Sequence, residues 1–256
     1  MYAASATASV HAQGNLPEAS GSLAGVPERD QAQRIAATQK LIAEQLQPTR
    51  RVMHAGDVLY HAGMPFGQLY LLTAGLFKLT QLAADGREQV VGVKFRGDWL
   101  GLDGMAAGQY DCDAVALDTS EVWTIHYEVL LTVAVKQPAL LTALHKAMGR
   151  EISGERGWLM SVCSLPTEAR VADFLLQWAK TQTARGLRGD QIRLRLSRAE
   201  IGNYLGMTLE SVSRGLSRLQ RENVIGFIGK GRHDLHIPDV GALVAFVQRR
   251  VGAELH

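Results

Sequence analysis

The sequence has very few cysteines and no long hydrophobic run. Only two of its 256 residues are cysteines, Cys112 and Cys163, too few for a disulfide framework or a four-thiolate metal site. No apolar run approaches the roughly 20 residues of a membrane-spanning helix, and the first residues do not resemble a secretory signal. With 46% hydrophobic and 20% charged residues, the composition is that of a globular protein. We therefore expect a cytoplasmic globular protein with no membrane segment and no metal site made of thiolates.

The charged residues nearly cancel, with a formal net charge of +2, but they are unevenly placed. Residues 165–232 hold twelve Lys and Arg against six Asp and Glu, whereas the rest of the chain has a net charge of −4. A basic segment joined to an acidic remainder indicates a polyanionic partner for the basic segment. Because charged stretches are more often solvated surfaces, this pattern needs the support of a motif.

Changes in periodicity divide the chain into regions. Residues 1–30, which start rich in Ala, Ser and Gly, are interpreted as a flexible tail. Residues 31–130 begin with a helix and continue as short runs rich in Val, Leu and Tyr, separated by turns. This spacing is typical of a small β-barrel or jelly roll. Within it, Asp85-Gly86 lies between two apolar runs and predicts a hairpin.

A helical period over residues 131–164 follows the barrel, with Pro138 suited to a first helical turn. Apolar residues recur there with heptad-like spacing, which favours a helix packed against the same helix of a second chain. The alternative is packing on the chain's own barrel. Glu155 would face its own copy in such a dimer and oppose dimerisation. The predicted dimer seam consists of Leu141, Leu144, Met148, Ile152, Glu155 and Leu159.

Residues 165–240 contain the signals of a helix, a tight turn and a second helix. Ser197 can cap the first helix, with Glu200 completing a capping box, and Gly206 can supply the positive φ that ends it. Thr208 can cap the second helix. The segments that follow are two strands of a wing, over 224–228 and 234–237, and a C-terminal helix or tail over 241–256. We therefore expect a winged helix-turn-helix domain.

The second helix presents polar side chains suited to DNA base edges. Arg214 can bond guanine twice, and Glu210, one turn earlier on the same face, can accept from cytosine and orient the guanidinium. Ser213 adds a compact polar contact. An isolated pair of this kind would be an ordinary surface pair, but inside a basic winged helix-turn-helix it predicts sequence-specific DNA binding. The expected phosphate and positioning contacts are Ser197, Arg198, Thr208, Ser211, Ser217, Arg218 and Lys230.

One motif in this segment resembles a known family. Arg198-x-Glu200-Ile201-Gly202-x-x-Leu205-Gly206-x-x-x-Glu210-x-Val212-Ser213-Arg214 is similar to the helix-turn-helix signature of the Crp/Fnr superfamily of bacterial transcription regulators. The resemblance covers roughly residues 45–240. It implies an α+β fold: a cyclic-nucleotide-binding-like barrel as sensor, a dimerisation helix and a winged helix-turn-helix. The pattern Glu210-x-x-Ser213-Arg214 looks like the Fnr branch, which implies a homodimer on a palindrome of TTGAT-type half-sites.

The resemblance also implies an activator that contacts RNA polymerase. The family uses a hairpin for such a contact, and the matching turn here contains Asp85, Gly86 and Arg87. An ordinary exposed hairpin is the alternative interpretation of this turn. The position of the DNA site on the promoter decides between activation and repression.

The two best-known effectors of the family do not match this sequence. Cyclic-nucleotide members bind the phosphate with an Arg-Ser pair after a Gly-Asp-x-x-Gly turn, but after Gly97–Gly101 no Arg or Lys occurs before Thr119. A buried phosphate without a cation is costly. The iron-sulfur cluster of the Fnr branch needs four thiolates, and no cysteine precedes Cys112. We therefore expect neither cAMP nor an iron-sulfur cluster.

The same residues leave other effectors open but do not fit other classes of protein. Haem and cyclic dinucleotides stay compatible with the sequence. The candidate haem ligands are His54, His61, His126 and His145. An enzyme would need a nucleophile–base pair, a phosphate-binding loop or a metal-ligand spacing, and none occurs. A ligand-binding module with a vestigial DNA domain is disfavoured because the base-reading residues are intact.

Overall fold

The computed structural model describes residues 28–229 and 233–254. Helix α1 (Glu28–Leu46) begins inside the segment predicted as a tail, so that prediction is wrong for residues 28–30. The rest of the predicted tail, the wing tip with Lys230, and the last two residues lie outside the described residues.

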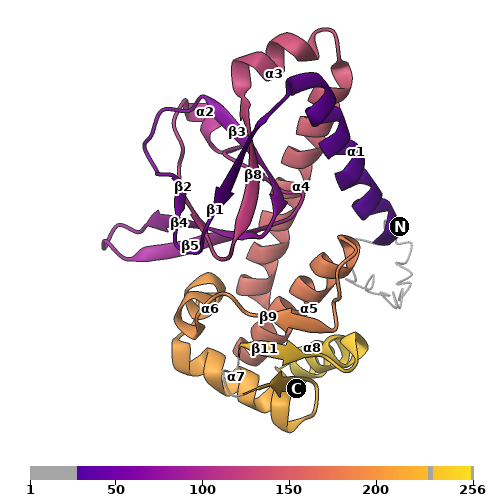
Figure 1. The fold of residues 1–256 in the computed structure, drawn as a ribbon. Coiled ribbons are helices and arrows are strands. Elements are labelled where there is room, and N and C mark those ends of the chain that lie inside the picture. Colours follow the sequence, from indigo (N-terminus) through magenta and orange to yellow (C-terminus); the bar gives the residue numbers. More distant parts are fainter. Residues whose placement is uncertain (1–27, 230–232, 255–256) are drawn as a thin grey trace, which may run out of the picture.

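Two antiparallel sheets form the N-terminal barrel (Figure 1). One sheet has the strand order β1-β8-β3-β6 and the other has the order β2-β7-β4-β5. The expected small β-barrel is therefore confirmed. Its strands are β1 (Thr49–Met53), β2 (Val58–Tyr60), β3 (Gln68–Ala74), β4 (Leu76–Leu82), β5 (Glu88–Phe95), β6 (Trp99–Leu100), β7 (Asp113–Ala116) and β8 (Ser120–His126).

Alternate residues of one strand serve two different cores. In β3, Tyr70 and Leu72 belong to the core inside the barrel, whereas Leu69 and Leu71 belong to a second core outside it. This alternation follows from the two-residue period of a strand, and it buries both faces of β3. Helices close the outer core. They are α1, α3 (Tyr127–Ala134) and α4 (Pro138–Ser164).

The predicted hairpin joins β4 and β5, which pair along their whole length. Gly86 has a φ of 79° in the turn, a conformation that glycine adopts without strain. The Asp85 carboxylate accepts hydrogen bonds from the backbone N–H and from Nε of Arg87. These bonds tie the two sides of the tip together, and the hairpin prediction is confirmed.

Helix α4 has a buried half and an exposed half. The predicted helix over 131–164 consists of the end of α3, a short break and α4, which has Pro138 in its first turn. Leu144 is only 3% exposed and packs in the outer core, so the prediction that it faces a second chain is wrong. Ile152 and Leu159 are 46% and 53% exposed. Periodicity reveals the apolar stripe but not which of its residues the chain's own barrel covers.

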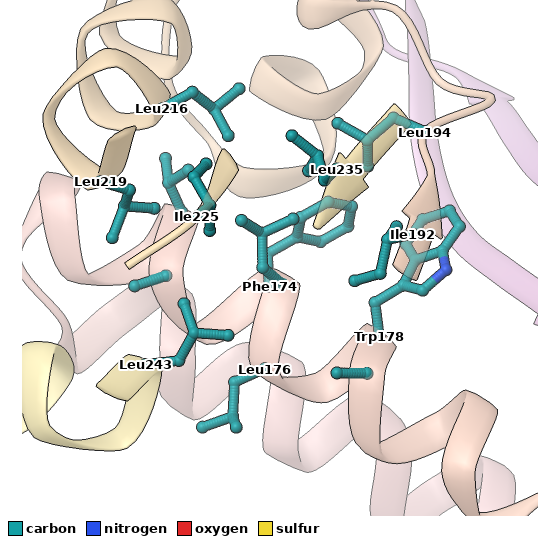
Figure 2. Packing of buried hydrophobic residues seen from close by; sticks show 14 of the residues in the cluster. Phe174, Leu176, Trp178, Ile192, Leu194, Leu216, Leu219, Ile225, Leu235 and Leu243 are labelled. Atoms are coloured by element: carbon teal, nitrogen blue, oxygen red, sulfur yellow. The ribbon is translucent and has the colours of Figure 1, made fainter. Parts of the chain in front are cut away.

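The C-terminal domain is a three-stranded sheet, of order β10-β11-β9, packed with helices. Figure 2 shows apolar side chains of α5, α7, α8 and the strands pointing toward one another in its core. The expected winged helix-turn-helix is confirmed. Its elements are α5 (Thr167–Ala184), β9 (Gln191–Arg193), α6 (Arg198–Leu205), α7 (Leu209–Arg221), β10 (Gly226–Ile228), β11 (Asp234–His236) and α8 (Val240–Glu254).

The barrel and the C-terminal domain share buried contacts. Apolar residues of β4 and β5 pack with the C-terminal core, and the rings of Phe95 and Trp178 meet edge to face at 5.1 Å. Arg185, after α5, donates to the Asp98 carboxylate at 2.6 Å and to the Arg96 carbonyl oxygen at 2.8 Å. The two domains are therefore joined by packing and ion pairs as well as by the chain.

Helix α4 is the longest described helix, at 27 residues. Its exposed half carries charged residues, among them Glu155 and Arg156. Across the described ranges, no helix is both long and apolar enough to cross a membrane.

Candidate nucleic-acid interface

The helix-turn-helix is built on side-chain caps. Ser197 Oγ accepts from the Glu200 N–H at 3.1 Å, while the Glu200 carboxylate accepts from the Ser197 N–H at 2.7 Å. Gly206 ends α6 with a φ of 64°. Thr208 Oγ1 then accepts from the Ser211 N–H at 3.2 Å and caps α7. Each predicted cap is present, and a cap of this kind contributes about 0.5–2 kcal/mol.

Two glycines allow the helices to approach closely. A Cβ on Gly202 of α6 would lie 2.7 Å from the Met207 carbonyl oxygen, and a Cβ on Gly215 of α7 would lie 2.9 Å from Cγ2 of Val171. A larger residue at either position would displace the turn or separate α7 from α5. The buried face of α7 consists of Val212, Gly215, Leu216 and Leu219. The opposite, polar face of α7 therefore turns to solvent.

The exposed face of α7 starts with Glu210 and Arg214, one helical turn apart. Hydrogen bonds from its own backbone N–H and from the Thr208 hydroxyl lower the pKa of Glu210, and the charge of Arg214 lowers it further. Arg214 Nη2 donates to Ser211 Oγ at 3.1 Å. The serine hydroxyl therefore holds the guanidinium, and Glu210 acts on it through charge rather than through the predicted orienting contact.

A shallow depression begins at Arg214 and continues along α7 toward its C-terminal end. Its arginines and hydroxyls form a surface suited to DNA phosphates. Arg221 is a member that the sequence patterns missed, and its signal is its place one turn after Ser217 on the same face. The depression is lined by Glu168, Ser213, Arg214, Ser217, Arg218 and Arg221.

Arg218, which was predicted to contact phosphate, forms ion pairs within the domain. Its Nη1 donates to both carboxylate oxygens of Glu168, at 2.5 and 2.7 Å, and its Nε donates to Glu222 at 3.2 Å. Glu222 also pairs with Arg249 and Arg250 of α8. Arg218 therefore ties α7 to Glu168 of α5, and Glu222, which directly follows α7, forms the ion pairs with α8. Sequence patterns do not show this role, because Glu168 lies 50 residues away along the chain.

Several of the other predicted phosphate contacts already have partners within the protein. The hydroxyls of Ser197 and Thr208 serve as helix caps. The Arg198 guanidinium lies over the ring of Phe227 in β10, 5.6 Å from its centre. The start of α6 is therefore adjacent to the wing. Lys230 lies outside the described residues.

The barrel interior holds a stack of tyrosines. The rings of Tyr60 and Tyr110 stack at 4.1 Å, and Tyr70 lies 5.7 Å from Tyr60. Burial, and then the neighbouring Asp103 carboxylate, raise the pKa of the Cys112 thiol to about 12. Cys112 Sγ lies 3.6 Å from Asp103 Oδ2. Aromatic rings, a protonated thiol and a carboxylate therefore line this part of the barrel.

Two protein families and several characterised relatives match the chain. Residues 50–137 match the cyclic nucleotide-binding domain, and residues 169–246 match the Crp-like helix-turn-helix domain. The chain is 34% identical to the transcriptional activator protein Anr of Pseudomonas aeruginosa over 193 residues. This aligned segment covers 75% of this chain and 79% of Anr. The chain is 32% identical over 181 residues to the fumarate and nitrate reduction regulatory protein of Escherichia coli, covering 71% and 72%.

A solved structure shows the same fold. FixK2 from Bradyrhizobium japonicum aligns with a TM-score of 0.68 at 24% sequence identity, covering 77% of this chain and 96% of that chain. The structural likeness supports the fold, while the sequence relatives, which are transcription regulators by name, support the function. With its barrel, its long helix and its capped helix-turn-helix, the chain belongs to the Crp/Fnr family of DNA-binding transcription regulators.

Proposed function

We propose that this regulator binds a palindromic promoter site as a homodimer and reads bases with Glu210, Ser213 and Arg214. The observation that carries the proposal is the exposed position of Glu210 and Arg214 in the first turns of α7, whose opposite face is buried. Arg214 is suited to guanine and Glu210 to cytosine. Two α7 helices would enter successive major grooves about 34–36 Å apart. Likeness to the Fnr branch supports TTGAT-type half-sites, and the cytoplasm is the compartment that this role requires.

The exposed half of α4 supports the homodimer. Ile152 and Leu159 expose about half of their surface, and Leu141 and Met148 are half-buried along the same face. An exposed apolar stripe on a long helix is stabilised by burial against a second copy. Glu155 lies exposed on this stripe, where two copies would bring like charges together. We expect a dimer whose strength Glu155 limits.

The contact with RNA polymerase is assigned to the tip of the β4–β5 hairpin. Asp85 and Arg87 are exposed there and bonded to each other, while Gly86 shapes the turn. A tip held in one conformation loses little entropy when it binds. Arg87→Ala should lower promoter activation in a purified transcription assay without changing DNA affinity, and unchanged activation would contradict the assignment.

Neither cAMP nor an iron-sulfur cluster is expected to control the protein. Residues 102–119 contain no Arg or Lys, and the buried Lys94 of β5 is paired with Glu151 of α4. The stacked rings of Tyr60 and Tyr110 occupy space inside the barrel. One buried and one exposed cysteine do not supply four thiolates.

A sensor gated by haem or by a cyclic dinucleotide is the second candidate. The four candidate haem ligands are exposed, and His54 and His61 face Asp57 and Asp113 at 3.6 and 3.3 Å. These pairings favour surface roles for both histidines. A visible spectrum of the protein with added haem tests the first ligand, and a DNA-binding titration with a cyclic dinucleotide tests the second.

The proposed function is tested by DNA binding of aerobically purified protein without added ligand. The protein is titrated onto a TTGAT-N4-ATCAA duplex and onto a scrambled duplex, at several salt concentrations. We expect at least about a thousandfold preference for the palindrome, the lower end for specific DNA-binding proteins. Equal affinities for the two duplexes would contradict base reading at this site.

A further inference from the structure

The strand β5 has a free edge that faces the helix-turn-helix. It is the outer strand of the sheet β2-β7-β4-β5, so among residues 28–229 and 233–254 no strand pairs with its second edge. Figure 1 shows α6 lying next to the barrel on the side of β4 and β5. The backbone N–H and C=O groups on an unpaired strand edge need hydrogen-bond partners. An edge without partners can pair with a strand of another chain.

The side chain of Asn203, on α6, pairs with this edge as a strand would. Its Oδ1 accepts a hydrogen bond from the Val90 N–H at 2.5 Å, and its Nδ2 donates to the Glu88 carbonyl oxygen at 2.8 Å. These two backbone groups lie two residues apart, which is the spacing at which one edge of a strand presents its groups to a neighbour. The oxygen and the nitrogen of one side-chain amide therefore bind two defined backbone positions of β5, which fixes where α6 lies along the strand.

Two further contacts support the same junction. Gln89 Nε2 donates to the Asn203 carbonyl oxygen at 2.7 Å. Lys78 Nζ of β4 donates to the carboxylates of Glu88 and Glu200 at 2.8 and 2.9 Å. Because Glu200 also caps α6 through Ser197, the start of α6 is bound to the same sheet that Asn203 contacts.

We propose that Asn203 is a positioning residue for DNA binding: it fixes the angle between the helix-turn-helix and the barrel, and so the separation of the two recognition helices in the dimer. The packing of Phe95 on Trp178 and the bonds of Arg185 to Asp98 and Arg96 join the domains at the end of β5, and a junction held at that place alone leaves rotation about it open. A two-point hydrogen bond to a strand edge does not tolerate that rotation. The inference rests on the proposed binding to a palindrome, where the half-sites lie about 34–36 Å apart and leave little freedom in angle.

The contact itself can be tested without DNA. Hydrogen exchange is followed in the full-length protein, in Asn203→Ala and in the matched amide-to-alanine control Gln177→Ala, whose side chain donates to Asp173 within α5. In Asn203→Ala we expect the backbone N–H of Val90 to exchange at least about tenfold faster, with the barrel interior still protected. The control should match the wild type. Unchanged exchange at Val90 would overturn the proposed contact.

The consequence for DNA is tested with duplexes in which the spacing between half-sites varies by one or two base pairs in each direction. Wild type should prefer one spacing by about tenfold or more, and Asn203→Ala should keep less than about threefold preference while its affinity for a single half-site is unchanged. Asn203→Asp, which keeps the size of the side chain but loses the donor to Glu88, should show the same loss.

Two outcomes separate the inference from the proposed function. Both variants could keep the wild-type spacing preference although the Val90 N–H exchanges faster. In that case Asn203 only provides hydrogen bonds to the β5 backbone, and the positioning role is wrong. If the wild type shows no sequence preference on any duplex, the proposed function fails, and the exchange measurement still decides whether Asn203 holds α6 to β5.

Discussion

The two domains bury similar apolar side chains but differ in where they place their polar ones. The barrel encloses the stacked rings of Tyr60 and Tyr110 together with the thiol of Cys112, whose raised pKa keeps it protonated. The helix-turn-helix domain keeps Glu210 and Arg214 outside, at the start of a helix whose other face is fully packed. Polar side chains that face solvent on a rigid helix indicate by their own hydrogen-bonding groups which kind of partner they can bind. Polar side chains enclosed in a core do not by themselves indicate a ligand.

The largest expected effect is that of Arg214→Ala, which removes the main base-reading group of the outward-facing domain. It should cost roughly 1–3 kcal/mol per half-site and relax base preference, because a bidentate contact to guanine is lost. The matched control is Arg188→Ala, an exposed arginine of the same domain that pairs with Asp190 away from α7. Competition binding measures both variants. An equal loss on cognate and scrambled DNA would mean that Arg214 only contacts phosphate.

Leu159→Asp tests whether the exposed half of α4 joins two copies. A charge placed in an apolar seam should weaken dimerisation by about a hundredfold, because the carboxylate must be desolvated in both copies. Val135→Asp, which alters an 82% exposed valine outside α4, is the control and should leave the dimer intact. Sedimentation over a range of concentrations reports the outcome. A variant that dimerises like the wild type would exclude this stripe as the seam.

Glu155→Ala should act in the opposite direction and less strongly. Removing two like charges from the seam should tighten the dimer by about tenfold or less, since partly exposed charges are screened. Light scattering and binding to the palindrome measure the change. Unchanged mass together with unchanged DNA affinity would contradict the role of Glu155.

The smallest effect concerns the junction between the domains. Burial alone would raise the pKa of Glu200, but hydrogen bonds from Lys78 and from Ser197 outweigh it and lower the pKa. The pair therefore stabilises the fold at pH values above the ordinary glutamate pKa of about 4.3, and this contribution is lost as the pH falls through the lowered value. Glu200→Gln should cost about 1 kcal/mol at pH 7 and progressively less below pH 4. A cost that does not change with pH would contradict the charged pair.

Local signals allowed the helix-turn-helix to be predicted from the sequence. Caps at Ser197 and Thr208, the turn at Gly206 and the face with Glu210 and Arg214 all depend on neighbours within a few residues. The order of barrel, long helix and wing was predictable for the same reason, because each has its own period and turn residues.

Contacts between distant segments were not predictable. Leu144 falls on the expected stripe, but the barrel covers it. Arg218 was predicted as a phosphate contact, but in the fold it forms an ion pair with Glu168, which lies 50 residues earlier in the chain. Asn203 has no pattern of its own, because its partners are backbone groups of a strand 113 and 115 residues earlier.

The most direct test of base reading is selection from a random-sequence duplex library, since it assumes no half-site. The wild type and Arg214→Ala are each equilibrated with the library, and the bound fragments are sequenced. The account predicts that the wild type enriches a palindrome with a guanine in each half-site and that Arg214→Ala loses preference at that guanine. Enrichment of no motif by the wild type, or of the same motif with the same strength by Arg214→Ala, would contradict it.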